Sequence, residues 1–548
     1  MRRHLLSLLC LVAAFIGVVS AQSNPAGRAG RANALDEATS FPTKLTPAAQ
    51  ALSVSFAKPV VYGSGGSGPR SLAVADLNND GYLDIVVANQ CPLDGYCPNG
   101  QVSVLLGNAQ GTFQSPALYS SGGVYANSVV IVDLRRNGIQ DLVVTNQCQD
   151  STCDNGGVSV LLGNGDGTFQ AAASYNSGGY GTNSVAVGDL NGDGVLDLVL
   201  TNECPVASQD CSQDLVDSTI SVFLGKGDGT FQTPVSYDSG GVAAGPIALS
   251  DLNGDGSLDI VAGHLCSAPE FYGCIGVFLN NGDGTFQPPA NIVAFQPPGQ
   301  ATSFGITDLN GDGVPDVAMS NLSGGVGVLL GNGDGTFQNV ALYGSGGAGG
   351  SNGLAIGDLN GDGIPDLVAS NLCRTLSKGA ACMGSSDTGV LVGNGNGTFL
   401  DAVSYSSGGI VPISVVSADV NGDGRPDLIV ANVCNKYCEN GTIGVLLNKT
   451  SRAPTTTTLT SSSNPSQVNQ AVTFTATITS SRIVPDGQVV QFYDGTVEMG
   501  MGSTTKGVAT FVTSFSKAKT YAIKAKYAGG GFLGASSGTV KQKVVNPE

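Results

Sequence analysis

The chain has 548 residues, including 80 glycines and no tryptophan; only 12% of its residues are charged, and its formal net charge is −18. This composition favours many short strands joined by tight turns over helices. The acidic balance argues against a nucleic-acid-binding protein, because contact with a phosphate backbone needs clustered Lys and Arg.

Residues 1–21 are predicted to be an export signal. Two arginines precede an apolar run from Leu5 to Val19, and small residues end at Ala21. The run is short for a bilayer span and no stop-transfer charges follow, so we expect cleavage and a mature chain without a transmembrane segment. A retained anchor helix is the alternative. Residues 22–52 would then form an N-terminal linker.

A nine-residue pattern based on Asp-x-Asn-x-Asp-Gly-x-x-Asp recurs at intervals of 50 to 62 residues. We number these aspartate loops 1 to 7 in chain order: Asp76–Asp84, Asp133–Asp141, Asp189–Asp197, Asp251–Asp259, Asp308–Asp316, Asp358–Asp366 and Asp419–Asp427. A repeat of this length indicates a propeller or a solenoid. Four short apolar segments bounded by Gly, Asn or Asp accompany each loop, and they predict four antiparallel strands.

The two ends of the repeat array favour a closed ring. After loop 7 the chain reaches Gly444–Leu447 without the Gly-Thr-Phe segment that follows in the other repeats. A matching segment lies ahead of loop 1, where Phe56–Gly66 resembles Phe113–Gly123. An N-terminal strand that completes the last sheet would remove the exposed edges of an open array. We therefore predict an all-β protein with a seven-bladed β-propeller over residues 53–449, in preference to a β-solenoid.

Six of the seven aspartate loops predict calcium sites. Calcium takes six to eight oxygen ligands. In loop 3 the side chains of Asp189, Asn191, Asp193 and Asp197 can converge, while Val195 offers its carbonyl. A plain hairpin turn is the alternative, but it does not explain carboxylates at three fixed positions, which repel one another without a cation.

We expect about six calcium ions, held by the residues at positions one, three, five, seven and nine of the complete loops. These residues are Asp76, Asn78, Asp80, Tyr82, Asp84, Asp189, Asn191, Asp193, Val195, Asp197, Asp251, Asn253, Asp255, Ser257, Asp259, Asp308, Asn310, Asp312, Val314, Asp316, Asp358, Asn360, Asp362, Ile364, Asp366, Asp419, Asn421, Asp423, Arg425 and Asp427.

Loop 2 departs from the pattern. Arg135 and Asn137 replace the usual Asn and Asp, which places a positive side chain where a cation would bind. We expect this loop to bind calcium weakly or not at all, with Arg135 substituting for the ion by pairing with Asp133 or Asp141.

Twelve cysteines lie beyond the predicted signal, and they fall into close pairs between the second and third strands of a repeat. Export and the even number favour disulfides over zinc, whose usual histidine ligands are not nearby. The predicted bridges are Cys91–Cys97, Cys148–Cys153, Cys204–Cys211, Cys266–Cys274, Cys373–Cys382 and Cys434–Cys438.

The cysteine loops are expected at the end of the ring opposite the aspartate loops, because alternate connections of an up-and-down sheet emerge on opposite sides. A rigidified loop face of this kind is a candidate ligand face. Each candidate residue there has an ordinary solvated loop residue as its alternative interpretation. The candidates are Tyr96, Asn202, Glu203, His264, Glu270, Tyr272 and Arg374.

The repeats resemble the FG-GAP/VCBS family, which also occurs in integrin α-subunits. The likeness is carried by Asp189–Asp197 together with Val158–Gly163 and Gly167–Phe169, repeated through residues 53–449. The resemblance implies a propeller, calcium in the loop between the first two strands, and ligand recognition on the opposite face. It does not identify the ligand, because a fold does not specify a function.

Residues 450–548 have a different sequence pattern. Apolar and polar residues alternate in several short segments, which predicts a β-sandwich. Pro485–Gly487, Phe492–Gly495 and Tyr527–Gly530 resemble the bacterial Ig-like repeats of surface proteins. This part of the sequence contains no cysteine, so the antibody-type bridge is absent.

The sequence favours a secreted or surface-exposed recognition or adhesion module for an extracellular glycan or protein. One alternative is an extracellular carbohydrate-active enzyme, a polysaccharide hydrolase or lyase, and another is a purely structural scaffold. His264 is the single histidine beyond the predicted signal and has no catalytic motif around it. No catalytic residue is assigned, although two carboxylates suffice to hydrolyse a glycoside.

Overall fold

The computed structural model describes residues 54–92, 99–205, 217–266, 272–295, 299–322, 324–373, 386–435 and 440–547. Every named element in these ranges is a β-strand, which confirms the all-β expectation. The predicted export signal and the N-terminal linker lie outside the described residues. Within the described ranges, no helix has the length and apolar character needed to cross a membrane.

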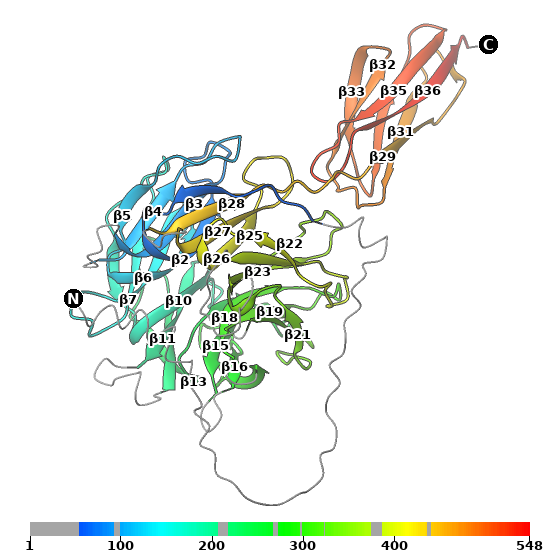
Figure 1. Ribbon diagram of the computed structural model, residues 1–548. Helices are drawn as coiled ribbons and strands as arrows, with labels where there is room; N and C mark the ends of the chain where they lie inside the picture. The colour runs from blue at the N-terminus through cyan, green and yellow to red at the C-terminus, as the bar shows by residue number, and fades with distance from the viewer. Residues whose placement is uncertain are drawn as a thin grey trace, which may run out of the picture. The chain divides into compact units, whose positions relative to one another are not determined.

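Antiparallel sheets in chain order form the body that carries the aspartate loops (Figure 1). Four of these sheets are β2–β5 (Gly66–Ala75, Asp84–Pro92, Gln101–Leu105, Ala117–Ser120), β6–β9 (Val124–Val132, Asp141–Cys148, Gly157–Leu161, Ala173–Asn176), β18–β21 (Ala301–Thr307, Asp316–Asn321, Gly325–Leu329, Ala341–Gly344) and β22–β25 (Ala348–Gly357, Asp366–Cys373, Asp387–Leu391, Val403–Ser406). Each aspartate loop connects the first two strands of its sheet, and its last aspartate begins the second strand.

Two further groups of four strands are joined by the single pair Val242–Leu265. They are β10–β13 (Tyr180–Gly188, Asp197–Cys204, Asp217–Phe223, Val235–Val242) and β14–β17 (Ile247–Ser250, Asp259–Leu265, Gly273–Phe278, Ala290–Phe295). The last sheet contains β26–β28 (Ile410–Ala418, Asp427–Cys434, Thr442–Leu446) and the N-terminal strand β1 (Val60–Gly63).

The first strand of each group contacts the first strand of the next group. The order β2, β6, β10, β14, β18, β22, β26 returns to β2, so the sheets form a closed ring. In Figure 1 the ring runs from the blue sheet of β2 through green to the yellow sheet of β26.

The two ends of the repeat array meet at one seam of this ring. Strand β1 pairs antiparallel with β28, with Val60 opposite Val445 and Tyr62 opposite Ile443. This pairing confirms that the N-terminal segment completes the last sheet. It also covers the edge of β28, so that the last sheet has four strands like its neighbours.

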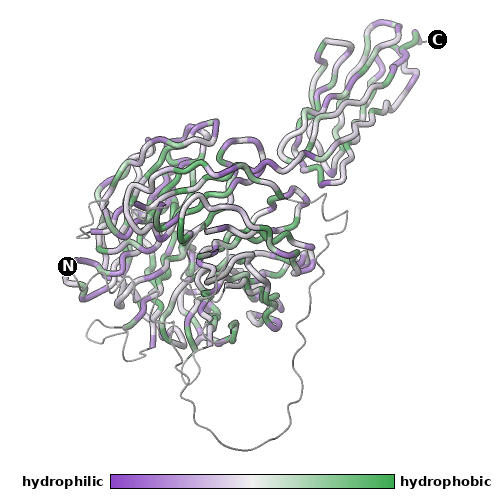
Figure 2. Tube along the Cα trace, viewed as in Figure 1, coloured by the Kyte–Doolittle hydropathy of each residue, from purple (hydrophilic) through white to green (hydrophobic). Residues whose placement is uncertain are grey.

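The cores lie between neighbouring sheets. The second strands are buried on both faces and read as nearly continuous apolar runs, as in Ile85–Ala88 of β3. One apolar cluster joins Ile85 of β3 to Ile429 of β27 across the seam. Figure 2 shows hydrophobic segments along the strands and hydrophilic turns at their ends. The outer strands have four to eight residues and are partly exposed, which suits sheet edges.

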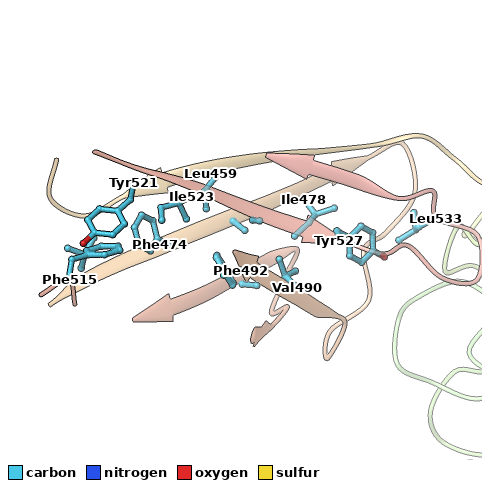
Figure 3. Packing of buried hydrophobic residues seen from close by; sticks show 14 of the residues in the cluster. Leu459, Phe474, Ile478, Val490, Phe492, Phe515, Tyr521, Ile523, Tyr527 and Leu533 are labelled. Carbon is cyan, nitrogen blue, oxygen red and sulfur yellow. The ribbon is translucent and has the colours of Figure 1, made fainter. Parts of the chain in front are cut away.

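The C-terminal part consists of two sheets that share one apolar core. The strands are β29–β36, in order Thr455–Ser461, Ser466–Gln467, Val472–Ser480, Val489–Asp494, Val497–Ser503, Val508–Thr513, Thr520–Tyr527 and Ser536–Val545. One sheet has the order β29-β31-β34 and the other β30-β36-β35-β32-β33. Phe474 of the first sheet and Phe492, Ile523 and Tyr527 of the second lie in this core (Figure 3).

Replacing Tyr62 by alanine should weaken closure of the ring. Its half-buried ring packs edge-on against Phe113 at 5.6 Å between centroids and joins the cluster at the seam. The loss of this packing should lower the stability by about 2 kcal/mol. Differential scanning calorimetry measures the change. The control is Val61→Ala on the same strand, because Val61 is 47% exposed. Equal melting of the two variants would contradict a seam that depends on packing.

Candidate functional site

The last aspartate of a loop is buried and accepts two backbone N–H groups. In loop 3, Asp197 Oδ2 accepts from Leu190 at 2.9 Å and Oδ1 accepts from Gly225 at 2.7 Å. Leu190 belongs to the loop, and Gly225 opens the hairpin between the third and fourth strands. The carboxylate therefore fastens both turns together at one end of the sheet. The same arrangement occurs at Asp84, Asp259, Asp316, Asp366 and Asp427.

Burial raises the pKa of these last aspartates, because it disfavours the charged form more than the two N–H bonds favour it. The pKa of Asp366 and that of Asp427 rise to about 7. The other two carboxylates of each loop add to the upward shift by repulsion. The ionised loop is therefore held at an electrostatic cost.

The first and second aspartates of a loop, at positions one and five, bond mainly to the loop itself. Asp189 accepts the N–H groups of Gly192 and Gly194 at 2.8 Å each, and Asp193 accepts that of Val195 at 2.7 Å. Gly194 has a φ of +83°, so its turn requires glycine. The five calcium-ligand positions predicted in each loop thus lie on one tight turn. Among the described residues, no three His, Cys, Asp or Glu side chains are already gathered as a metal site.

Loop 2 contains the predicted internal ion pair. Arg135 donates from Nη2 to Asp141 Oδ1 at 2.7 Å and from Nε to Oδ2 at 3.2 Å, and Nη2 also reaches the Gly163 carbonyl at 2.9 Å. Asp133 instead accepts the N–H groups of Asn137 and Gly138. Of the two partners that we considered for Arg135, the structure selects Asp141.

Cysteine bridges occur at the opposite ends of the sheets. The structure contains the predicted bridges Cys148–Cys153 and Cys266–Cys274, with Cα–Cα distances of 4.8 and 5.6 Å. Cys91, Cys204 and Cys434 are also disulfide-bonded, while Cys97, Cys211, Cys382 and Cys438 lie outside the described residues. The bridges confine the connections between second and third strands, as the sequence predicts.

Two candidates for the ligand face are buried, and the prediction that they are loop residues is wrong. Asn202 and His264 are fully buried in the second strands of their sheets. Asn202 accepts a hydrogen bond from Thr182 Oγ1 at 3.0 Å and donates to Ser221 Oγ at 2.9 Å, which pins neighbouring strands together. The strands extend further from the aspartate loops than the apolar runs indicate, so this position falls inside the sheet.

The remaining candidates are divided between described and undescribed residues. Glu203 is half-buried on β11, and Tyr272 is half-buried with its carbonyl accepting the Cys266 N–H at 2.9 Å. Tyr96, Glu270 and Arg374 lie outside the described residues.

A charged partner of Glu203 escaped the sequence analysis. Arg70 on β2 interacts electrostatically with Glu203, although the two residues belong to different sheets. Burial lowers the pKa of Arg70 and raises that of Glu203, while the opposite charge of each partner counteracts the shift. A comparison of the repeats could have found Arg70, because it stands six residues before its loop, where Asn127 and Asn183 stand in the next two repeats.

These two asparagines show what the position does elsewhere in the ring. Asn127 donates to the Thr182 carbonyl at 2.9 Å, and Asn183 donates to the Ala244 carbonyl at 3.3 Å, each reaching the inner strand region of the next sheet. The position therefore lies where inner strands meet. At this position Arg70 places a charge in the interior of the ring.

The fold and the loops define a repeat protein with a closed ring of sheets and an acidic turn in every repeat. The FG-GAP-like repeat family matches residues 151–200, 209–262, 265–319, 308–369 and 380–430, and the FG-GAP repeat family matches 68–105. The bacterial Ig-like domain family (group 3) matches 459–545. The chain belongs to the FG-GAP repeat proteins and carries a C-terminal bacterial Ig-like domain.

No curated protein matches the sequence. Among solved structures, the periplasmic gluconolactonase PpgL of Pseudomonas aeruginosa is similar with 15% identity and a TM-score of 0.43, over 62% of this chain and 85% of that chain. Sqt1 of Saccharomyces cerevisiae is similar with 11% identity and a TM-score of 0.42, over 72% of this chain and 99% of that chain.

His264 should make the fold sensitive to acid. Burial lowers its pKa to about 4 from an ordinary 6.5, so between these pH values the unfolded chain binds the proton more tightly than the folded chain. The contribution of neutral His264 to stability is complete above pH 6.5 and is lost as the pH falls toward 4. Between pH 7 and 4.5 the wild type should lose about 2 kcal/mol more than His264→Asn.

Thermal melts of the two proteins at both pH values measure this difference. Asparagine is a matched replacement, because Asn202 occupies the same position in the preceding repeat. The titrating carboxylates are the same in both proteins, so their effect on stability cancels in the difference between the two. An equal loss of stability in both would refute the assignment to His264.

Proposed function

We propose that this protein is a secreted or surface-exposed calcium-binding recognition module, built from a seven-bladed β-propeller and an Ig-like β-sandwich. The ring of inner strands and the pairing of β1 with β28 support the propeller. The two sheets around the C-terminal core support the sandwich. The disulfides and the two families suit an extracellular protein.

The observation that carries the calcium proposal is the guanidinium group in loop 2. It lies against the buried carboxylate of Asp141 and the Gly163 carbonyl, and thus marks a place where a positive charge is accommodated. The complete loops have asparagine in place of Arg135 and keep three carboxylates, so a divalent cation can supply the missing charge. Their carboxylate, amide and carbonyl oxygens are the ligands that calcium prefers.

The residues that would hold the ion are those at positions one, three, five, seven and nine of a complete loop. Asp197 still has lone pairs available beyond its two N–H bonds, because an ionised carboxylate has about four acceptor sites. Calcium, when bound, would neutralise the three carboxylates and fasten the first two strands of the blade.

Recognition is proposed for the end of the ring that carries the disulfide-bonded connections. The bridges reduce the freedom of these connections, so less conformational entropy is lost on binding. The half-buried Arg70 and Glu203 offer a cation and an acceptor to a polar ligand. An extracellular glycan or a protein segment with hydroxyl and carboxylate groups suits this pair.

Calcium should raise the melting temperature of the full chain. At a concentration about 100-fold above Kd, each occupied site adds about 2.7 kcal/mol. Calorimetry in CaCl2 and in EGTA, with MgCl2 as the ion control, measures the shift. Identical melting in CaCl2 and in EGTA would remove the basis of the calcium proposal.

Asp193→Asn should change the stability of the protein in opposite directions in EGTA and in CaCl2. In EGTA it removes one of three repelling carboxylates of loop 3, so stability should rise slightly. In CaCl2 the variant should lack the stabilisation that one bound ion contributes. The matched control is Asp166→Asn in a hairpin, because Asn396 already occupies the equivalent hairpin position and accepts the same Thr contact.

A glycan array that includes acidic polysaccharides, probed with the full chain in calcium, tests the recognition role. We expect binding that falls at least tenfold in Arg70→Gln or Glu203→Gln. It should persist in Lys226→Gln, which removes an exposed charge from a hairpin on the aspartate-loop side. Release of soluble products from a polysaccharide would support the enzyme instead, and failure to bind glycans in parallel with capture of an extracellular protein would identify a protein ligand.

A further inference from the structure

Loop 7 contains a positive charge of its own. Arg425 donates from Nε to Asp423 Oδ1 at 3.2 Å and from Nη2 to Asp423 Oδ2. The pair is bidentate, the strongest geometry between a guanidinium and a carboxylate. Both side chains are largely shielded from water. The second carboxylate of the loop is thereby neutralised from within the chain.

Loops 3 and 5 have a neutral hydrogen-bond partner at this carboxylate. In loop 5 the second aspartate, Asp312, accepts from the neutral Asn310 amide at 2.8 Å, and Asp193 of loop 3 accepts from Asn191 at 3.0 Å. The seventh position of a loop is uncharged in every repeat except the last. The residues there are Tyr82, Ile139, Val195, Ser257, Val314, Ile364 and Arg425.

Loops 2 and 7 therefore receive an arginine from two different positions. Arg135 stands at the third position and donates to the last aspartate, whereas Arg425 stands at the seventh and donates to the second aspartate. Each arginine brings one positive charge to the loop, where it repels a further cation.

Arg425 also fastens the seam of the ring. Its Nη1 donates to the Thr450 carbonyl at 2.9 Å, and Thr450 Oγ1 accepts the Ser55 N–H at 3.0 Å. Ser55 precedes the N-terminal strand β1, and Thr450 follows β28. The internal cation thus connects loop 7 to the place where the two ends of the ring meet.

We infer that Arg425 takes the place of the divalent cation in loop 7, so that calcium occupies loops 1, 3, 4, 5 and 6 alone. This inference rests on the proposed calcium binding, and it replaces the sixth ion expected from the sequence with an ion pair. The seam is then the one region of the ring, besides loop 2, whose aspartate loop needs no metal. Loss of calcium would leave the closure of the ring in place.

The number of bound ions tests this inference. The full chain and its variants are saturated with calcium, freed of excess ion by gel filtration and analysed by mass spectrometry of the metal. We expect five ions in the wild type, six in Arg425→Val, and four in Tyr82→Arg. The last variant installs the arginine in loop 1 at a side chain that is 38% exposed, so little packing is lost.

Two further variants keep the count interpretable. Arg136→Ala removes an exposed arginine next to loop 2's ion pair and should leave five ions. Arg425→Gln retains the length of the side chain without its charge, so it should also give six ions if Arg425→Val does not fold. Elution at the volume of the wild type establishes that each variant is folded.

The outcomes separate this inference from the proposed function. A wild type with six ions, unchanged in Arg425→Val and Arg425→Gln, would overturn the inference and leave calcium binding intact. A wild type with no calcium would overturn both. Five ions in the wild type that rise to six without Arg425 and fall to four in Tyr82→Arg would establish it.

Discussion

The ring depends on a buried carboxylate that six of the seven aspartate loops use in the same way. At the start of the second strand, an aspartate such as Asp197 accepts one N–H from its own loop and one from the hairpin between the third and fourth strands. A buried N–H group without a partner is costly, and here one side chain satisfies two of them. Two turns of a sheet are thereby fixed relative to each other.

This solution introduces an electrostatic problem, because two more carboxylates lie on the same turn. The chain resolves it with arginine in two loops, through Arg135 and Arg425. In the other loops the same charge is proposed to come from calcium. The acidic net charge of the protein thus follows from the way in which its turns are built, and does not by itself indicate a cationic partner. On this proposal, the ring responds to the calcium concentration only at the loops that lack an arginine.

The opposite ends of the sheets use a different chemistry. Here disulfides such as Cys148–Cys153 and Cys266–Cys274 and buried asparagines such as Asn202 join neighbouring parts of a sheet. Arg70 and Glu203 are charges that this framework carries without using them to hold a turn. A charge pair in the interior of a ring is costly to bury, and such a cost is commonly accepted at a functional site.

The pattern of residues along the chain was enough to predict the repeat, the position of each acidic turn between two strands, the closure by the N-terminal strand and the ion pair of the arginine in loop 2. These features are local or follow from the spacing of similar segments, so periodicity and turn chemistry suffice to predict them. Tertiary structure decided which side chains are covered. Asn202 and His264 looked like loop residues until the packing of neighbouring strands buried them. Arg70 meets Glu203 because the ring brings distant repeats together. Arg425 can pair with Asp423 while its guanidinium also donates to the Thr450 carbonyl at the seam. Neither contact follows from the pattern of residues along the chain.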